Sequence, residues 1–324
     1  MPHAIRFHET GGPDVLRWEA VDVEDPAPGE IQVRHAAVGL NFIDVYHRTG
    51  LYPLPLPSGI GLEGAGAVTA VGPGVSEFAA GDRVAYANPP VGSYSEVRNM
   101  PAHRAIKIPD GIDERTAAAM MLKGLTAQYL LRRTCRVEHG DTILLHAAAG
   151  GVGLIACQWA RALGATVIGT VGSDEKAELA RAHGCDHVIV YARENFVERV
   201  KEITDGRGVR AVYDSIGKDT FDGSLDCLQP MGMMVSYGSA SGPVAPFQPA
   251  TLAAKGSLFL TRPTLMVYTA KREDMLDMAG ELFDVVESGK VVIEINQTYP
   301  LAEAARAHRD LEARKTTGST ILVP

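Results

Sequence analysis

Residues 142–164 are the stretch that most constrains the fold of this chain. A short apolar run at 142–147 is typical of a buried strand, and Gly150, Gly151 and Gly153 then form a turn with little side-chain bulk. Beyond the turn, apolar residues recur at helical spacing. A helix that begins at such a turn directs free N–H groups and a partial positive charge towards whatever lies over it. The pattern therefore predicts the phosphate-binding corner of a dinucleotide site.

The surrounding sequence strengthens this interpretation. Ala148 stands where the usual glycine pattern has its first glycine, so the motif alone is weak. A second strand-like run at 166–171 follows at once and completes the strand–helix–strand unit that the motif requires. The alternative is a glycine turn that only packs a helix on a sheet; dinucleotide binding is favoured over it.

Size and composition indicate an ordinary globular protein with two domains. The chain has 324 residues, of which 46% are hydrophobic and 22% charged. Its net charge of −8 disfavours non-specific binding to nucleic acid or anionic membranes. No apolar run approaches the length of a spanning helix, and residues 1–10 lack the apolar core of a signal peptide. The four cysteines form no CxxC pair, which favours free thiols in a reducing cytosol and argues against zinc. We expect a cytoplasmic enzyme.

Residues 1–123 have the composition of an all-β, loop-rich domain. Short strand-like segments at 31–38, 65–71 and 83–86 are separated by many Gly and Pro residues. These two residue types supply the positive or fixed φ angles that tight turns need. The composition therefore predicts a separate β-rich domain over these residues.

From residue 124 the pattern changes to alternating strands and helices. Strands are predicted near 142–147, 166–171, 187–190, 209–213, 232–237 and 257–261, and helices near 151–163, 174–183, 194–204 and 219–228. This alternation predicts an α/β fold with a doubly wound parallel sheet over residues 124–262. Residues 263–324 contain an amphipathic stretch at 272–288 and a strand-like run at 319–323. Because the sheet is already complete, we expect this tail to return to the first domain.

The end of the second predicted strand favours NADP over NAD. An NAD site usually has Asp or Glu there to accept bonds from the ribose hydroxyls, whereas this chain has Gly172 and Ser173. A 2′-phosphate needs donors and positive charge, which Ser173, Lys176 and Arg193 are placed to supply. Asp174 and its neighbour Glu175 count against this assignment. The alternative makes Ser173 only a helix cap and Lys176 only a solvated helix residue.

Six separated segments resemble the medium-chain dehydrogenase/reductase superfamily, and within it the zinc-free, zeta-crystallin-like NADPH:quinone oxidoreductases. They lie at residues 41–53, 59–66, 123–129, 146–153, 212–217 and 256–263. The resemblance covers essentially the whole chain. It implies a GroES-like, β-rich catalytic domain built from residues 1–123 and the tail, a Rossmann domain between them and a cleft where the two meet.

The resemblance also implies positions for the cofactor-binding residues. It places Asn41, Phe42, Ile43, Asp44, Val45 and Tyr46 beside the nicotinamide, and Tyr129 near the cofactor. Gly150, Gly151 and Val152 fall at the pyrophosphate, Gly172, Ser173 and Lys176 at the 2′-phosphate, and Tyr191 near the adenine ribose. The rest of the site is implied to contain Ser215, Tyr237, Gly238, Ser239, Ala240, Leu265, Met266, Val267 and Arg314.

The chain departs from its zinc-dependent relatives at the metal ligands. Where those relatives have Gly-His-Glu, this chain has Gly61, Leu62 and Glu63, and no cysteine precedes Cys135. A catalytic zinc needs three good ligands and an open position, and no such set is evident. We expect no metal in this site.

Without a metal to polarise an alcohol, reduction of an electron-poor acceptor such as a quinone is the favoured chemistry. The protein then has to hold the nicotinamide close to a flat substrate and exclude water. Asn41, Tyr46, Tyr52 and Lys123 are the candidate catalytic residues, since each can bind or orient a substrate oxygen. Their alternative role is structural, or as contacts to the nicotinamide amide. One-electron and two-electron transfer both remain open.

Two other functions are compatible with the sequence. One is NADPH-dependent reduction of an enone or alkenal double bond, and the other is a largely non-catalytic NADPH-binding protein of crystallin type. A nucleic-acid role is disfavoured by the acidic balance. The apolar run 257–261 would leave an unprotected sheet edge, so we expect a homodimer.

Overall fold

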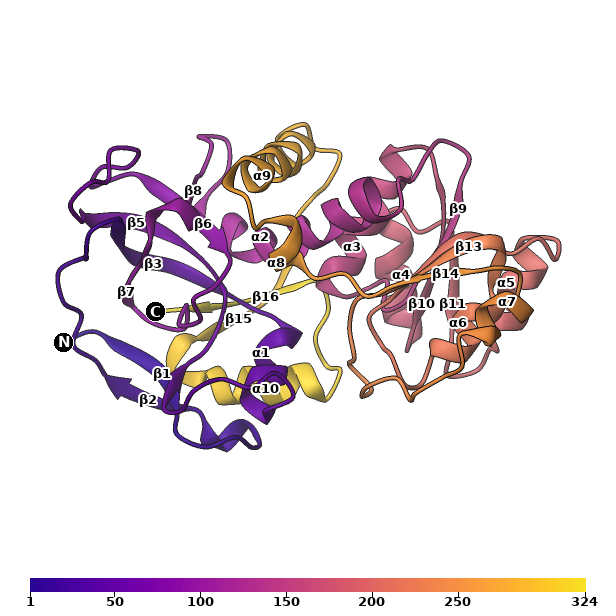
Figure 1. The fold of residues 1–324 in the computed structure, drawn as a ribbon, viewed down its shortest axis with the longest axis horizontal. Helices are drawn as coiled ribbons and strands as arrows, with labels where there is room; N and C mark the ends of the chain where they lie inside the picture. Colours follow the sequence, from indigo (N-terminus) through magenta and orange to yellow (C-terminus); the bar gives the residue numbers. More distant parts are fainter. The chain divides into compact units, whose positions relative to one another are not determined.

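The computed structural model describes residues 1–324, which divide into two compact units (Figure 1). The β-rich unit comprises residues 1–125, 269–287 and 293–324, and the parallel-sheet unit comprises residues 126–268 and 288–292. The expected boundary after residue 262 thus differs from the division that the structure makes. Tyr268 groups with the parallel-sheet unit because its ring stacks on Tyr129, with centroids 4.6 Å apart, and its hydroxyl bonds to Thr134 Oγ1 at 2.7 Å.

The parallel-sheet unit has the doubly wound architecture predicted from the alternating pattern. Its six parallel strands follow the order β11-β10-β9-β12-β13-β14. The chain reverses direction across the sheet after β11, which places a switch point between β9 and β12. The strands are β9 (Thr142–Leu145), β10 (Thr166–Val171), β11 (His187–Val190), β12 (Val209–Asp214), β13 (Leu228–Ser236) and β14 (Phe259–Thr261).

Helices alternate with these strands along the chain (Figure 1). Strands made of unbroken apolar runs are expected to be covered by helices on both faces of the sheet. The helices are α3 (Gly151–Ala162), α4 (Asp174–Ala182), α5 (Phe196–Ile203), α6 (Phe221–Asp226), α7 (Ala250–Ala254) and α8 (Leu265–Tyr268). The six strands and the helices α3 to α6 lie within a few residues of the predicted ranges, whereas α7 and α8 were not predicted. The left-handed residues Ala147 (φ 55°) and Ser257 (φ 56°) fall just outside β9 and β14, which are shorter than predicted. Strand β13 begins four residues earlier than predicted.

The β-rich unit contains two sheets. A three-stranded sheet has the order β2-β1-β4, and a seven-stranded sheet has the order β15-β16-β3-β5-β6-β8, with β7 paired to β3. The strands are β1 (His3–Phe7), β2 (Arg17–Ala20), β3 (Glu30–Leu40), β4 (Ser58–Gly59), β5 (Glu63–Val71), β6 (Arg83–Ala87), β7 (Val97–Pro101), β8 (Ile106–Lys107), β15 (Ile295–Pro300) and β16 (Ser319–Val323). Strand β16 pairs antiparallel with β3, so the end of the chain completes a sheet begun near its start.

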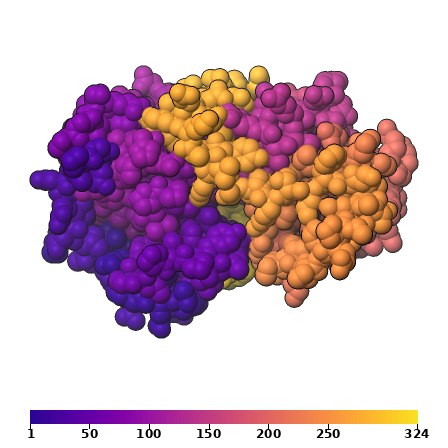
Figure 2. Space-filling view, in the orientation of Figure 1, coloured from indigo at the N-terminus to yellow at the C-terminus, as the bar shows by residue number.

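The prediction that residues 1–123 are all-β was wrong, because α1 (Phe42–Thr49) and most of α2 (Glu114–Gln128) lie within them. The tail adds two more helices to the β-rich unit, α9 (Arg272–Glu287) and α10 (Ala304–Glu312). Gly and Pro marked the turns, but the Ala-rich run that forms α2 buries residues 117–121 completely, a tertiary effect that composition does not show. Helix α9 lies on the surface of this unit beside the first chain segment (Figure 2), where Arg272 bonds to the carbonyl oxygens of His103 and Ala105. None of the helices is both long and apolar enough to cross a membrane.

Candidate active site

The turn between β9 and α3 has the shape that a pyrophosphate-binding turn requires. Ala147 adopts a left-handed conformation, Gly150 is extended (φ −81°, ψ 173°), and α3 begins at Gly151. A Cβ on Gly153 would lie 2.3 Å from the carbonyl oxygen of Ala147 and 2.5 Å from that of Ala148. Only glycine therefore lets the first turn of α3 lie directly against the strand end. Of the predicted residues, Gly151 and Val152 occupy the first turn of α3, where N–H groups have no partner within the helix. Gly150 is the N-cap, and its N–H donates to the Ala147 carbonyl oxygen at 2.9 Å.

The end of β10 brings together three of the residues predicted for the adenosine side. Ser173 is the N-cap of α4, and its Oγ accepts the Lys176 backbone N–H at 3.4 Å. A Cβ on Gly172 would lie 2.8 Å from the Tyr191 hydroxyl, so Tyr191 is packed against this glycine. Gly172, Ser173 and Tyr191 thus form one small surface beside the first turn of α4.

Arg193 is engaged differently from the prediction. Its guanidinium makes two hydrogen bonds to the Asp174 carboxylate, at 2.8 and 2.6 Å, on the exposed surface. This pairing lowers the pKa of Asp174 and offsets the negative charge that counted against a 2′-phosphate. Arg193 therefore acts on Asp174, while Ser173 and Lys176 remain the residues at the predicted phosphate position.

Asp214, at the end of β12, organises the loop that follows this strand and was missed by the sequence analysis. Its Oδ1 accepts the backbone N–H groups of Ile216 and Gly217 at 2.8 and 3.0 Å. Its Oδ2 accepts the hydroxyls of Thr220 and Ser224 at 2.7 and 2.9 Å. The four bonds fix the loop that carries the predicted residue Ser215. The signal available in the sequence was an Asp placed directly after a buried strand.

His146 extends this buried network to the neighbouring strand. Its Nε2 lies 2.9 Å from Ser224 Oγ, and its Nδ1 lies 2.8 Å from Thr170 Oγ1. Burial lowers the pKa of His146, which favours the neutral ring. The network joins the ends of β9, β10 and β12, the edge of the sheet at which ligands bind in this class of fold.

The loop after β13 lies against the loop after β12. The Ala240 N–H donates to the Ser215 carbonyl oxygen at 3.1 Å, and a Cβ on Gly238 would lie 2.4 Å from that same oxygen. Arg262, another residue not predicted, donates to the carbonyl oxygens of Ser236 and Gly238 at 2.9 and 3.0 Å. The structure therefore groups five of the predicted residues: Ser215, Tyr237, Gly238, Ser239 and Ala240.

Two further predicted segments lie elsewhere in the parallel-sheet unit. Tyr129 is buried against Tyr268, and this burial raises the pKa of its hydroxyl well above its ordinary value. Leu265, Met266 and Val267 form the short helix α8, in which Leu265 is buried and Val267 is 71% exposed. Their contact with a cofactor stays a prediction.

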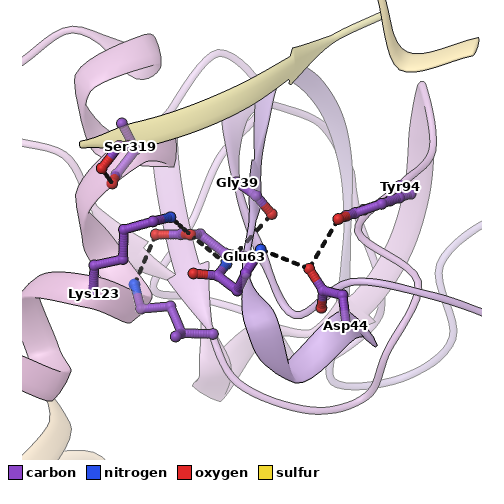
Figure 3. Close-up of polar contacts among 9 residues, drawn as sticks. Gly39, Asp44, Glu63, Tyr94, Lys123 and Ser319 are labelled. Atoms are coloured by element: carbon purple, nitrogen blue, oxygen red, sulfur yellow. Dashed lines mark hydrogen bonds and ion pairs between the residues drawn. The ribbon is translucent and has the colours of Figure 1, made fainter. Parts of the chain in front are cut away.

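In the β-rich unit, the residues predicted beside the nicotinamide begin at the junction of β3 and α1. Asn41 caps α1, and its backbone N–H donates to Asp44 Oδ2 at 2.9 Å (Figure 3). The Tyr94 hydroxyl donates to the same oxygen at 2.9 Å. Burial raises the pKa of Asp44 to about 7, although these two hydrogen bonds oppose the shift. The carboxyl group that fixes the Asn41 backbone thus titrates close to neutral pH.

The predicted aromatic residues form a cluster on α1. Tyr46 packs edge-on against Tyr52, with ring centroids 5.2 Å apart, and Phe42 lies 5.6 Å from Tyr46. Tyr46 is buried, whereas Tyr52 is 37% exposed. Arg314 follows α10 in a left-handed turn (φ 58°) of the same unit, and its predicted cofactor contact is untested.

Lys123, the last predicted catalytic residue, is buried and paired with Glu63. Its Nζ lies 3.1 Å from Glu63 Oε2, and both side chains are almost completely shielded from solvent. The same Glu63 oxygen accepts the Asn41 side-chain amide at 2.7 Å (Figure 3). Two candidate catalytic residues therefore meet on one carboxylate that the sequence analysis did not select.

The residues around Glu63 do not fit a zinc ion. Both Glu63 oxygens already accept hydrogen bonds, from the Leu122 backbone N–H and from Asn41 and Lys123. Leu62 is buried beside it and offers no ligand atom. No group of three or more His, Cys, Asp or Glu side chains in the chain is placed to hold a metal ion.

Comparison with known proteins identifies the family. Residues 27–110 match the family model of the alcohol dehydrogenase GroES-like domain, and residues 151–281 match that of the zinc-binding dehydrogenases. The chain is 56% identical to a quinone oxidoreductase of Pseudomonas aeruginosa, with all of both chains covered. It is 49% identical to a 2-haloacrylate reductase of a Burkholderia species, covering 100% of this chain and 99% of that protein.

A solved structure agrees with these sequence relationships. The quinone oxidoreductase of Escherichia coli in complex with NADPH superposes with a TM-score of 0.98 at 51% identity, covering 99% of this chain and 100% of that one. The identity far exceeds what a shared fold alone would give. The chain belongs to the quinone oxidoreductase family, the zinc-free branch of the medium-chain dehydrogenase/reductase superfamily that its sequence resembles.

Proposed function

We propose that this protein catalyses the NADPH-dependent reduction of quinones, with the acceptor bound beside the nicotinamide and no metal taking part. The observation that carries the proposal is the full-length match, at 51% identity, to a quinone oxidoreductase crystallised with NADPH. The turn before α3 supports it independently, because Gly153 lets the start of α3 lie directly against the end of β9, the place where a pyrophosphate binds in this class of fold.

In this proposal each group of residues has one task. Bound NADPH supplies the reducing equivalents. Gly150, Gly151 and Val152 hold its pyrophosphate, and Ser173 with Lys176 holds its 2′-phosphate. Residues 41–46 and Tyr129 bind the nicotinamide end. The polar groups of Tyr46, Tyr52 and Lys123 orient the acceptor oxygens, so the protein contributes mainly by positioning.

A second candidate is reduction of an activated carbon–carbon double bond. It is favoured by the 49% identity to a 2-haloacrylate reductase over the full chain. An electron-poor alkene conjugated to a carboxylate or carbonyl has the same need for a nearby nicotinamide and a polarising donor. The two functions can be distinguished by comparing the rates at which quinones and activated alkenes are reduced.

The test is NADPH oxidation across a panel of quinones, alkenals, 2-haloacrylates and alcohols, before and after treatment with a chelator. We expect rapid oxidation with quinones, slower oxidation with conjugated alkenes and none with alcohols. NADH is expected to be a poorer donor, and the chelator is expected to leave the rate unchanged. Faster turnover of alkenes than of quinones would favour the second candidate. NADPH binding without oxidation by any acceptor would contradict both.

We also propose that the enzyme is a cytoplasmic homodimer. Its four cysteines are free thiols, as a reducing compartment favours. Strand β14 forms one edge of the parallel sheet and exposes 56% of the Phe259 side chain, so pairing with a second copy would satisfy the edge. Sedimentation equilibrium at micromolar protein is expected to give twice the mass of one chain. Phe259→Lys should shift the mass towards that of the monomer, whereas a monomeric wild-type protein would refute the pairing.

A further inference from the structure

The Glu63 carboxylate is the point at which three elements of the β-rich unit meet. Glu63 is the first residue of β5 and is completely buried. Its Oε1 accepts the Leu122 backbone N–H of α2 at 2.7 Å, and its Oε2 accepts Lys123 Nζ at 3.1 Å and Asn41 Nδ2 at 2.7 Å (Figure 3). This one carboxylate therefore binds Asn41 and Lys123, the two candidate catalytic residues that are not tyrosines.

The backbone of β3 holds this carboxylate in place. Gly39 faces Glu63 in the antiparallel pair of β3 and β5. A Cβ on Gly39 would lie 2.0 Å from Glu63 Oε2 and 2.5 Å from the Ala118 carbonyl oxygen. The carboxylate thus occupies space that every other residue type at position 39 would fill, and it has little freedom to move.

The positive charge of Lys123 compensates the negative charge of the buried Glu63 carboxylate. A buried carboxylate is costly unless it is paired and hydrogen-bonded, and Glu63 receives one cation and two further N–H donors. Asp44 lies in the same cluster: the Glu63 charge raises its pKa, and Lys123 lowers it. Replacing such a pair by apolar residues would be neutral or stabilising in many proteins. Its presence next to the candidate nicotinamide-binding segment therefore points to a role other than stability.

We propose that Glu63 is a positioning residue, which orients the Asn41 side-chain amide and the Lys123 ammonium for reaction at the nicotinamide. Asn41 Nδ2 donates to Glu63 Oε2 at 2.7 Å and to the Gly39 carbonyl oxygen at 3.4 Å, and the Asn41 side chain also caps the Asp44 backbone N–H at the start of α1. These contacts fix the orientation of the amide, and its oxygen keeps a second lone pair that can accept a hydrogen bond from a ligand. The Lys123 ammonium has three N–H donors: one donates to Glu63, and the other two can donate to a ligand oxygen. This inference rests on the proposed function and adds a residue to it.

Glu63→Gln is the primary test. The two Glu63 oxygens accept hydrogen bonds from three donors. The amide of a glutamine has one oxygen and one NH₂ group, so the NH₂ group must face at least one of these donors and that hydrogen bond is lost. We expect the single-turnover rate of NADPH oxidation by a quinone to fall about 100-fold, the loss typical of a reacting group misplaced by about 1 Å. The Kd for NADPH should change little, since none of the residues proposed to hold its phosphate groups belongs to the Glu63 cluster. The fluorescence of bound NADPH should shift, because it reports on the nicotinamide surroundings.

The double variant Glu63→Gln, Lys123→Met keeps the inference testable if the single variant does not fold. It removes both charges of the Glu63–Lys123 ion pair together and should therefore fold. Because Glu63 acts partly through Lys123, Lys123→Met should cost much less rate in the Glu63→Gln background than in the wild type. A double variant that transfers at the wild-type rate would overturn the inference.

Glu312→Gln is the matched control. Glu312 is also a glutamate that accepts two hydrogen bonds from a buried cation, Arg48, in the same unit. Its loss should lower the melting temperature without changing the transfer rate or the fluorescence of bound NADPH. A purely structural Glu63 would behave like Glu312, which would also overturn the inference.

Failure of the inference and failure of the proposed function give different results. If wild-type protein binds NADPH but reduces no quinone, the proposed function is wrong, and the fluorescence of bound NADPH still decides the role of Glu63. An unshifted spectrum in folded Glu63→Gln would then refute its positioning role. A shifted spectrum would support it.

Discussion

Gly153→Ala is expected to weaken NADPH binding about thirtyfold and to destabilise the protein by about 3 kcal/mol. The new methyl group would lie 2.3 and 2.5 Å from the carbonyl oxygens of Ala147 and Ala148, which are backbone atoms that cannot rotate away. Helix α3 must then move off the turn, and its N-terminal N–H groups lose their alignment with the pyrophosphate. A lost charge-assisted hydrogen bond of about 2 kcal/mol accounts for the expected change in affinity.

Isothermal titration with NADPH and urea unfolding measure the two effects of Gly153→Ala. Gly280→Ala is the matched control, because Gly280 lies within α9 and a Cβ there meets no atom within 4 Å. That substitution should raise stability by about 1 kcal/mol, the helix propensity difference, and leave NADPH affinity unchanged. If Gly153→Ala bound NADPH as tightly as the control does, the proposed pyrophosphate site would be wrong.

His308→Gln is expected to make stability less sensitive to acid. His308 is buried between Arg48, which donates to its Nδ1 at 3.2 Å, and the Tyr94 hydroxyl, 3.3 Å from its Nε2. Burial and the Arg48 charge lower its pKa to about 3, against 6.5 in the unfolded chain. Between these values the unfolded state binds one more proton at this site than the folded state. Stability from His308 therefore rises with pH across this window by about 1.4 kcal/mol per pH unit.

A glutamine can replace both hydrogen bonds of His308 without titrating, since its amide oxygen accepts from Arg48 and its N–H₂ donates to Tyr94. The slope of unfolding free energy against pH, measured with urea between pH 4 and 6, should fall by about 1.4 kcal/mol per pH unit. Parallel curves for the wild type and the variant would contradict the assignment of a neutral, buried His308.

Other buried groups contribute to the same window and remain in the variant. Burial lowers the pKa of His35 to about 4 and also lowers the pKa values of His47 and His146, so their contributions to stability also rise with pH. The pKa of Asp44 is raised to about 7, so in this window the folded state holds a proton that the unfolded state has lost. The Asp44 contribution therefore falls as pH rises, and it opposes that of His35.

The parallel-sheet unit was largely predictable from sequence because its signals are local. Strands β10 and β11 have the ends predicted for them, and α3 begins at the glycine turn as expected. The buried hydrogen-bond network of His146, Ser224 and Asp214 inside this unit was not predicted. His146 reaches Ser224 and Asp214, about 70 residues further along the chain, only because parallel strands align their carboxyl ends.

The β-rich unit was less predictable from sequence, because its pairings join segments that are far apart in the chain. Strand β16 pairs with β3 across nearly the whole chain length, and no local pattern specifies such a partner. The prediction of an all-β segment also missed α1 and α2. The first is short, and the second depends on burial of its Ala-rich face for its stability.

The sequence by itself determined the alternation of strands and helices from β9 to β13, the glycine turn before α3 and the membership of a zinc-free reductase family. These follow from residue spacing and from motifs a few residues long, which act over short distances. Only the tertiary structure decided that Glu63 joins Asn41 to Lys123, and that Asp44, Tyr94 and His308 form one buried chain of hydrogen bonds. Burial sets the pKa values of such groups, and burial depends on which distant segments pack together.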